Sequence, residues 1–325
     1  MAWHRETVVM DIFSILVSSM HHKFRFFLGL ISSLRLEQWV KNLFIFLPMF
    51  FNGQMLNISV LLPCIIAFIA FSFAASSIYC FNDIYDVELD KLHPEKCKRP
   101  IASGIISKKT AYIMMAVCFL FSMLILFFFG GNASNVLLAL VVFYYVMNLA
   151  YSVRLKQYAI VDVIIISIGF VLRVWVGGIA SNIWLSEWII IMTFLLALFL
   201  AFAKRRDDVI LYENTGTFLR KNTNKYNLEF MNQVITFIAT ITVIAYIMYT
   251  LSPDVIERFH SKHIYFTSVF VLMGIIRYLQ LTIVYLKNCN PTKILLSDRF
   301  IQCCVIGWVI SFILIIYFGK SNGIQ

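Results

Sequence analysis

Long apolar runs are the feature of this sequence that most restricts its fold. Runs of about 20 residues recur along the chain of 325 residues, and each is long enough to cross the roughly 30 Å hydrocarbon core of a bilayer as a helix. Hydrophobic residues make up 61% of the chain and charged residues only 14%, whereas a soluble domain of this size needs a more charged exterior. The sequence therefore predicts an all-α, polytopic transmembrane helical bundle.

Nine membrane spans are predicted from these runs. The first is short and contains Pro48. Before it, residues 1–34 hold an apolar stretch too short to span, which indicates a cytoplasmic or interfacial segment. One transmembrane domain follows at residues 35–320. The expected spans are 39–54, 59–80, 110–130, 135–153, 160–180, 187–204, 232–251, 263–285 and 300–318.

The distribution of positive charge predicts the orientation of the chain. Most of the 27 Lys and Arg residues lie in the N-terminal segment and in the loops after the second, fourth, sixth and eighth spans. The positive-inside rule places these loops and the N-terminus in the cytoplasm, and the C-terminus outside the cytoplasmic (inner) cell membrane. Although the net charge is +10, it sits in short loops, which argues against a nucleic-acid partner.

An acidic segment follows the second span. Asp83, Asp86 and Asp90 are spaced by three and four residues, and Asn82 lies four residues before Asp86, so all are expected on one face of a helix. Stacked carboxylates repel one another unless a cation binds, and Mg²⁺ commonly uses one or two carboxylates together with substrate phosphates. We therefore predict catalytic roles for these four residues, with Asp83 and Asp86 as Mg²⁺ ligands. The basic residues that follow are suited to phosphate oxygens: Lys96, Lys98 and Arg99.

This segment resembles the first aspartate motif of the UbiA prenyltransferase superfamily. The residues that carry the resemblance are Asn82-Asp83-x-x-Asp86-x-x-x-Asp90, His93-Pro94, Lys96 and Arg99-Pro100-Ile101-Ala102-Ser103-Gly104. The nine-span layout agrees, so the resemblance covers nearly the whole chain. It implies a helical bundle around a central cavity that opens to the membrane for a polyprenyl chain, with Mg²⁺ on the motif aspartates.

A departure from that family pattern concerns the second aspartate motif, expected after the sixth span. In this sequence Lys204, Arg205 and Arg206 stand where acidic residues are expected, and Asp207 and Asp208 remain. A basic cluster binds a phosphate directly, without a metal. One site is thus predicted to bind a Mg²⁺-diphosphate, and the other a bare phosphate.

That combination resembles the branch of the superfamily that transfers phosphoribosyl groups to decaprenyl phosphate. Further matches are Arg35-x-x-Gln38-Trp39-Val40-Lys41-Asn42, Tyr151-Ser152-x-x-Leu155-Lys156, and Asp162 with Gly169 and Arg173. The resemblance implies phosphoribosyl diphosphate as donor, a polyprenyl phosphate as acceptor, and a product for cell-envelope glycan precursors or another ribosylated lipid. The lipid phosphate is expected near Lys41, Lys156, Lys204 and Arg205. The expected substrate-binding residues are Lys41, Asn42, Lys96, Arg99, Tyr151, Lys156, Asp162, Arg173, Lys204 and Arg205.

Three charged residues are expected within or beside spans. Asp162 and Arg173 lie eleven residues apart, about three helical turns, so both are expected on one face that points into the bundle. Arg277 has no motif around it, and we interpret it as a packing residue.

Two other functions remain open at this point. A transferase of the same superfamily with a prenyl diphosphate donor and an aromatic or other small acceptor fits the first motif, but not the basic replacement of the second. A transporter fits the spans and the charges within them, although no internal repeat supports it. Asp86 or Asp90 could also contact ribose hydroxyls instead of the metal. The sequence carries no indication of the oligomeric state.

Overall fold

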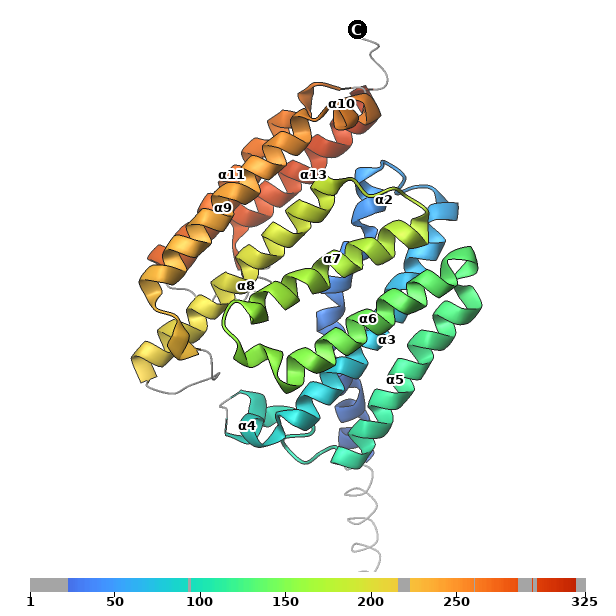
Figure 1. Cartoon of the computed structure of the whole chain (residues 1–325), viewed down its shortest axis with the longest axis vertical. Coiled ribbons are helices and arrows are strands. Elements are labelled where there is room, and N and C mark those ends of the chain that lie inside the picture. The colour runs from blue at the N-terminus through green and yellow to red at the C-terminus, as the bar shows by residue number, and fades with distance from the viewer. Residues whose placement is uncertain are drawn as a thin grey trace, which may run out of the picture. The chain divides into compact units, whose positions relative to one another are not determined.

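The computed structural model describes residues 23–92, 95–215, 223–259, 261–285, 294 and 297–319. Within these ranges the chain is helical and forms no β-strand, which confirms the predicted all-α class (Figure 1). The long helices are α3 (Ile58–Tyr85), α5 (Lys108–Phe129), α6 (Ser134–Val153), α7 (Val161–Ser181), α8 (Glu187–Thr215), α9 (Leu228–Leu251), α11 (Ser268–Leu279) and α13 (Arg299–Gly319).

Shorter helical elements connect them. Residues 23–34 are also helical and lead into a 3₁₀ helix, Leu36–Phe46. The short α-helices are α2 (Leu47–Phe51), α4 (Val87–Lys91) and α10 (Pro253–Phe259). The remaining short elements are 3₁₀ helices at Lys96–Lys98, Gly131–Ala133, Leu155–Gln157, Thr223–Lys225 and His263–Thr267, and a π-helix at Gln280–Val284.

Seven helices in the described ranges are long and apolar enough to cross a membrane, so the chain is a multi-pass membrane protein. They coincide with the second to eighth predicted spans. The ninth predicted span coincides with α13, in which the residues with described side chains form an apolar helix at Arg299–Ile315. The first predicted span is not one long α-helix, because a 3₁₀ helix and the five-residue α2 share residues 36–51. The total of nine spans, and the central cavity, stay predictions.

Helix ends follow local capping chemistry. The side chain of Ser107 accepts a hydrogen bond from the Thr110 N–H at 3.1 Å and begins α5, and Asn227 accepts one from the Phe230 N–H at 2.8 Å and begins α9. At the other end of a span, Asn182 adopts a left-handed conformation (φ 53°) and ends α7. These polar residues therefore set the places where apolar helices enter and leave their loops.

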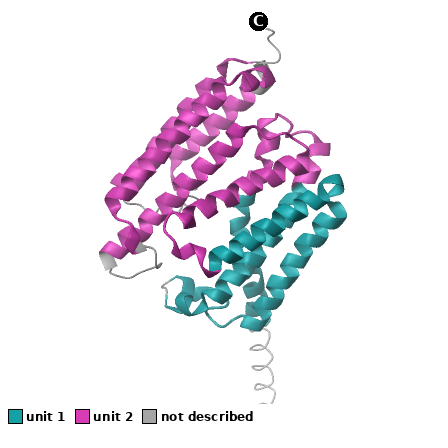
Figure 2. Ribbon diagram, viewed as in Figure 1, with its two compact units in different colours: residues 1–43, 65–152 teal, residues 44–64, 153–325 magenta. Residues whose placement is uncertain are grey.

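The chain divides into two compact units, coloured teal and magenta in Figure 2. Unit 1 contains residues 1–43 and 65–152, and so most of α3 together with α4, α5 and α6. Aromatic rings hold its helices together: the ring centroids of Phe71 on α3 and Tyr144 on α6 are 4.4 Å apart, and those of Phe119 on α5 and Tyr145 on α6 are 4.1 Å apart. A second cluster of buried residues packs around the end of α3 and the start of α5: Ile84, Val87, Ile101, Ile106 and Ala111.

Unit 2 contains residues 44–64 and 153–325. In it α8 packs against both α7 and α9, and α11 packs against α13. One end of its core holds Phe199 of α8, whose ring centroid lies 5.2 Å from that of Tyr278. Another cluster joins α2 to α13, where the rings of Phe50 and Phe312 stack at 5.5 Å.

A close approach between backbones fixes α2 and the preceding 3₁₀ helix on α7. A Cβ atom at Gly177 would lie 1.9 Å from the carbonyl oxygen of Ile45, and backbone atoms have little freedom to withdraw.

We expect Gly177→Ala to lower the free energy of unfolding by about 1–3 kcal/mol, as overpacking does. Thermal unfolding in detergent would measure this. The control is Gly274→Ala on α11, where the nearest atom would be Cys304 Cβ at an ordinary 3.7 Å. Equal melting temperatures for the two variants would contradict the prediction.

Candidate functional site

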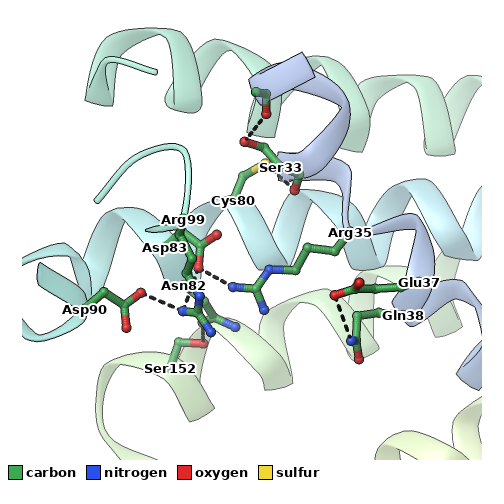
Figure 3. Close-up of polar contacts among 11 residues, drawn as sticks. Ser33, Arg35, Glu37, Gln38, Cys80, Asn82, Asp83, Asp90, Arg99 and Ser152 are labelled. Carbon is green, nitrogen blue, oxygen red and sulfur yellow. Dashed lines mark hydrogen bonds and ion pairs between the residues drawn. The ribbon is translucent and has the colours of Figure 1, made fainter. Parts of the chain in front are cut away.

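The first candidate site lies in unit 1, where α3 ends (Figure 3). We call it the aspartate centre: Arg35, Asn82, Asp83, Asp90, Arg99 and Ser152. Asn82 and Asp83 belong to the last turn of α3, and Asp90 belongs to α4. Asp83 and Asp90 are each only 3% exposed. Two carboxylates so far removed from water require partners of opposite charge.

Two arginines supply that charge. Arg99 Nη1 donates to Asp90 Oδ2 at 2.6 Å and to Asp83 Oδ1 at 3.1 Å. Arg35 Nη2 also donates to Asp83 Oδ1. The aspartate centre is thus a network in which one guanidinium bridges two carboxylates and one carboxylate oxygen bridges two guanidiniums.

The acidic residues do not lie on one continuous helix, because a turn at Asp86 separates α3 from α4. Tyr85 ends α3 and Val87 begins α4, with Asp86 between them as the N-cap residue of α4. The i to i+4 pattern continues through the junction, because the Asp86 N–H donates to the Asn82 carbonyl and the Asp90 N–H to the Asp86 carbonyl. Asp83 and Asp90 both accept hydrogen bonds from Arg99. Asp86, which lies between them in the sequence, is half-buried.

Arg35 is a residue that the list of predicted site residues missed, although it opens one of the quoted motifs. Its backbone has φ 51°, a left-handed conformation that residues other than glycine rarely adopt. Its neighbourhood is fixed by Trp39 Nε1, which donates to Ser76 Oγ at 3.1 Å, and by Ser76 Oγ, which donates to the Leu34 carbonyl at 2.7 Å. Its guanidinium also lies 5.1 Å from the ring centroid of Tyr79.

Unit 1 also contains other predicted site residues. Asn42 is buried and its Nδ2 donates to Ser72 Oγ at 2.8 Å, which ties the 3₁₀ helix to α3. The Ser152 hydroxyl, next to the predicted Tyr151, contacts Asn82 Oδ1 and the Asn148 carbonyl. The predicted residues Lys41, Lys96 and Tyr151 are half-buried. His93 and Pro94 lie outside the described residues.

The second candidate site lies in unit 2. We call it the arginine centre: Asp162, Arg205 and Asp208. Arg205 Nε donates to Asp162 Oδ2 at 2.5 Å, and Arg205 Nη1 donates to Asp208 Oδ2 at 3.2 Å. Asp162 is 0% exposed and Arg205 2% exposed. This ion pair joins the first turn of α7 to α8, so Arg205 serves helix packing, and its contact with a lipid phosphate stays a prediction.

The basic run of α8 does not form one cluster. Arg206 is buried, and its guanidinium donates to Asn232 Oδ1 at 2.6 Å and to the Thr282 carbonyl at 2.8 Å. Lys204 is exposed. Successive residues of a helix are about 100° apart, so Lys204, Arg205 and Arg206 point in different directions. Lys41 belongs to unit 1 and Lys156 to unit 2, so the predicted grouping of lysines around a lipid phosphate also stays a prediction.

A tyrosine supports the start of α7. The Ile160 N–H donates to the Tyr226 hydroxyl at 2.6 Å. Ile160 has φ 68°, which is a strained conformation for a β-branched residue. Burial raises the pKa of the Tyr226 phenol, so this group stays protonated at neutral pH. Sequence reasoning did not single out Tyr226, because a tyrosine in a polar loop carries no motif.

Two other charged residues of the predicted spans, Arg173 and Arg277, have structural partners. Arg173 is buried, as predicted, and its Nη1 donates to the Gly169 carbonyl at 2.7 Å. Arg277 Nη2 donates to Asp298 Oδ2 at 2.8 Å, which agrees with the packing role inferred for Arg277. This hydrogen bond holds the pKa of the Asp298 carboxyl below its usual range.

The aspartate centre fits Mg²⁺ by the chemistry of its donors. Among the described residues there is no group of three His, Cys, Asp or Glu side chains placed to hold a metal by themselves. Mg²⁺ does not need such a cage, since it is commonly held by one or two carboxylates and by the phosphates of its substrate. In the aspartate centre, Asp83 and the side-chain oxygen of Asn82 are oxygen donors of that kind, and Asp86 is another in the same segment.

Comparison with known proteins gives a consistent result. Residues 43–295 match the family model of the UbiA prenyltransferase family. The chain is 33% identical to decaprenyl-phosphate phosphoribosyltransferase of Mycolicibacterium smegmatis over 90% of this chain and 93% of that protein. It is 31% identical to the protein of the same name from Corynebacterium glutamicum over 89% of this chain and 87% of that protein.

Solved structures show the same fold. A UbiA homolog from Archaeoglobus fulgidus bound to DMAPP and Mg²⁺ superimposes with a TM-score of 0.64 at 16% identity, covering 89% of this chain and 99% of that chain. An apo UbiA homolog from Aeropyrum pernix superimposes with a TM-score of 0.60 at 14% identity, covering 86% and 98%. At these identities the likeness concerns the fold.

Proposed function

The chain belongs to the UbiA prenyltransferase family, and on that premise we propose that it transfers a 5-phosphoribosyl group from phosphoribosyl diphosphate to a polyprenyl phosphate. The observation that carries the proposal is the match of about nine-tenths of the chain, at 31–33% identity, to enzymes named for this transfer. The product is then a ribosylated lipid for cell-envelope glycan precursors.

The two charged centres support this choice of donor. The aspartate centre has carboxylates next to arginines that solvent reaches, with side chains of Arg35 and Arg99 that are 20% and 29% exposed. In the arginine centre, Asp162 and Asp208 are both paired with the buried Arg205. A buried arginine thus already neutralises Asp208 of α8, which does not favour a second Mg²⁺ site of the kind that a prenyl diphosphate uses.

The reaction follows from the charges of its reactants. The acceptor is a phosphate monoester that is already anionic near neutral pH, so it needs little help from a general base. The bond between the ribose C1 and the diphosphate oxygen breaks with its electron pair on the diphosphate, and an oxygen of the lipid phosphate bonds to C1. Lys96 and Arg99 would stabilise the departing diphosphate. Asp83 and Asp86 would hold Mg²⁺, which supplies further charge neutralisation on that group.

The proposed location is the cytoplasmic membrane, with the N-terminus and the aspartate centre on the cytoplasmic side. The positive-inside distribution of Lys and Arg supports it. A water-soluble donor such as phosphoribosyl diphosphate then reaches the site from the cytoplasm, while the polyprenyl chain of the acceptor stays in the bilayer.

A donor-preference assay tests the proposal. Purified protein with Mg²⁺ would receive radiolabelled phosphoribosyl diphosphate and polyprenyl phosphate in one reaction, and a radiolabelled prenyl diphosphate with 4-hydroxybenzoate in another. We expect labelled lipid in the first reaction only. Product in the second reaction alone would replace the proposal with an aromatic prenyltransferase, and product in neither would remove both.

A further inference from the structure

We propose that Arg35 and Arg99 act as exchangeable counter-ions: they bind Asp83 and Asp90 in the substrate-free protein and move onto the donor diphosphate when the diphosphate arrives with Mg²⁺. This inference rests on the proposed function, because it needs a diphosphate-bearing donor. It assigns Arg35 to substrate binding and makes metal binding dependent on the diphosphate.

Charge balance is the first argument. The two carboxylates and two guanidiniums of the aspartate centre carry formal charges that cancel, and both carboxylates are 3% exposed. A lone Mg²⁺ held by Asp83 and Asp86 would lie beside the two guanidiniums bound to Asp83, in a place where water screens little. A diphosphate brings several negative charges and offers the arginines the bidentate partner that guanidiniums favour. The metal therefore binds well only together with the anion.

The contacts of Asp83 show how the exchange is possible. Both arginines donate to the same oxygen, Asp83 Oδ1, so neither contact uses Oδ2. Arg35 and Arg99 are the partly exposed members of the network, whereas the carboxylates are buried. The guanidiniums can therefore swing toward a ligand while the carboxylates stay in place.

Backbone strain at Arg35 is an independent observation. A left-handed conformation is strained for a residue with a side chain, and glycine would avoid this strain. Strained residues that persist are concentrated at ligand-binding positions. Glycine would relieve the strain at position 35, but it would not supply the guanidinium that contacts Asp83. This combination is expected of a residue that serves binding and not stability.

The arginine centre provides the contrast. Arg205 is also bound by two carboxylates, but its side chain is 3% exposed and that of Asp162 is 0% exposed. An incoming anion that takes Arg205 from Asp162 would leave a fully buried carboxylate without its partner. The exchange of arginines from carboxylates to a diphosphate is therefore assigned to the aspartate centre, and the arginine centre is a fixed structural ion pair.

Binding of Mn²⁺, measured by electron paramagnetic resonance in detergent, tests the exchange without any transfer reaction. Each protein would be titrated with Mn²⁺ alone and with Mn²⁺ plus inorganic diphosphate, against matched samples without protein that define the free metal. For the unaltered protein we expect weak binding of Mn²⁺ alone and a gain of about ten-fold or more with diphosphate, and by linkage Mn²⁺ must raise diphosphate affinity by the same factor.

Variants identify the residues responsible. Arg35→Gln removes a competing cation, so it should bind Mn²⁺ alone about ten-fold more tightly and should show a smaller gain with diphosphate. Arg35→Lys, which keeps the charge, should resemble the unaltered protein in Mn²⁺ alone. Arg154→Gln, an equal charge change at an exposed position, is the matched control and should change neither value. Arg99→Gln serves as the second test if Arg35→Gln does not elute as a folded protein in size-exclusion chromatography.

Two results would overturn the exchange: equal Mn²⁺ affinity of the unaltered protein with and without diphosphate, or no tighter Mn²⁺ binding in either glutamine variant. Failure of the proposed function gives a different pattern. Inorganic diphosphate would still tighten Mn²⁺ binding, while the transfer assay with phosphoribosyl diphosphate would give no product.

Discussion

Asp83→Asn is expected to reduce phosphoribosyl transfer about a thousand-fold, the upper range for losing one group that stabilises developing charge. Asparagine has the same shape but no charge, so the predicted Mg²⁺ ligand is lost. The fold should survive, because Arg99 keeps Asp90 at 2.6 Å and Arg35 keeps its position over the Tyr79 ring. The measurement is transfer of radiolabel from phosphoribosyl diphosphate to polyprenyl phosphate, with size-exclusion chromatography as the check of folding.

Glu88→Gln is the matched control for this variant. Glu88 belongs to α4, between Asp83 and Asp90 in sequence, and its side chain is 70% exposed. A hydrogen bond from Lys91 lowers the pKa of the Glu88 carboxyl, so the residue is ionised at neutral pH and the substitution removes one full negative charge. Glu88→Gln should transfer at the unaltered rate. Full activity of Asp83→Asn, or equal losses in both variants, would show that Asp83 does not hold the metal.

The spans were predictable because the bilayer imposes a simple length rule. The run predicted at 59–80 is α3, Ile58–Tyr85, and the run at 160–180 is α7, Val161–Ser181. The rule fails at the first predicted span. There the chain forms a 3₁₀ helix followed by a short α-helix that starts beside Pro48, and hydropathy does not distinguish these from one α-helix.

The candidate site was predictable in its acidic residues but not in its partners. The spacing of Asp83, Asp86 and Asp90 identified the segment, yet it did not reveal the end of α3 at Tyr85. The pairing of Asp83 with Arg35 joins residues 48 positions apart, and local patterns carry no information about such a contact.

Arg205 shows the opposite limit of sequence reasoning. A run of three basic residues indicates an exposed phosphate-binding cluster, but burial depends on which helix covers each side chain. The pairing of Arg205 with Asp162 spans 43 positions and required the packing of α7 on α8.

Asp162→Leu is expected to cause the largest loss of stability, about 3–5 kcal/mol, because it leaves the buried Arg205 charge without its main partner. Asp208 stays within reach of Arg205 at 3.2 Å, but its side chain is 15% exposed and compensates only in part. For a chain of this size the loss corresponds to a fall in melting temperature of roughly 5–15 °C, measured by thermal unfolding in detergent.

Two further variants distinguish a lost ion pair from a lost packing contact. Asp162→Leu combined with Arg205→Met removes both charges, so it should recover much of the melting temperature, since an apolar pair often replaces a buried ion pair without loss. Asp298→Asn breaks the pair with Arg277, whose side chain is 28% exposed, and should lower the melting temperature far less. Two results would show that Arg205 does not depend on Asp162 for its charge compensation. One is that Asp162→Leu has the melting temperature of the unaltered protein; the other is that the double variant has a lower melting temperature than Asp162→Leu.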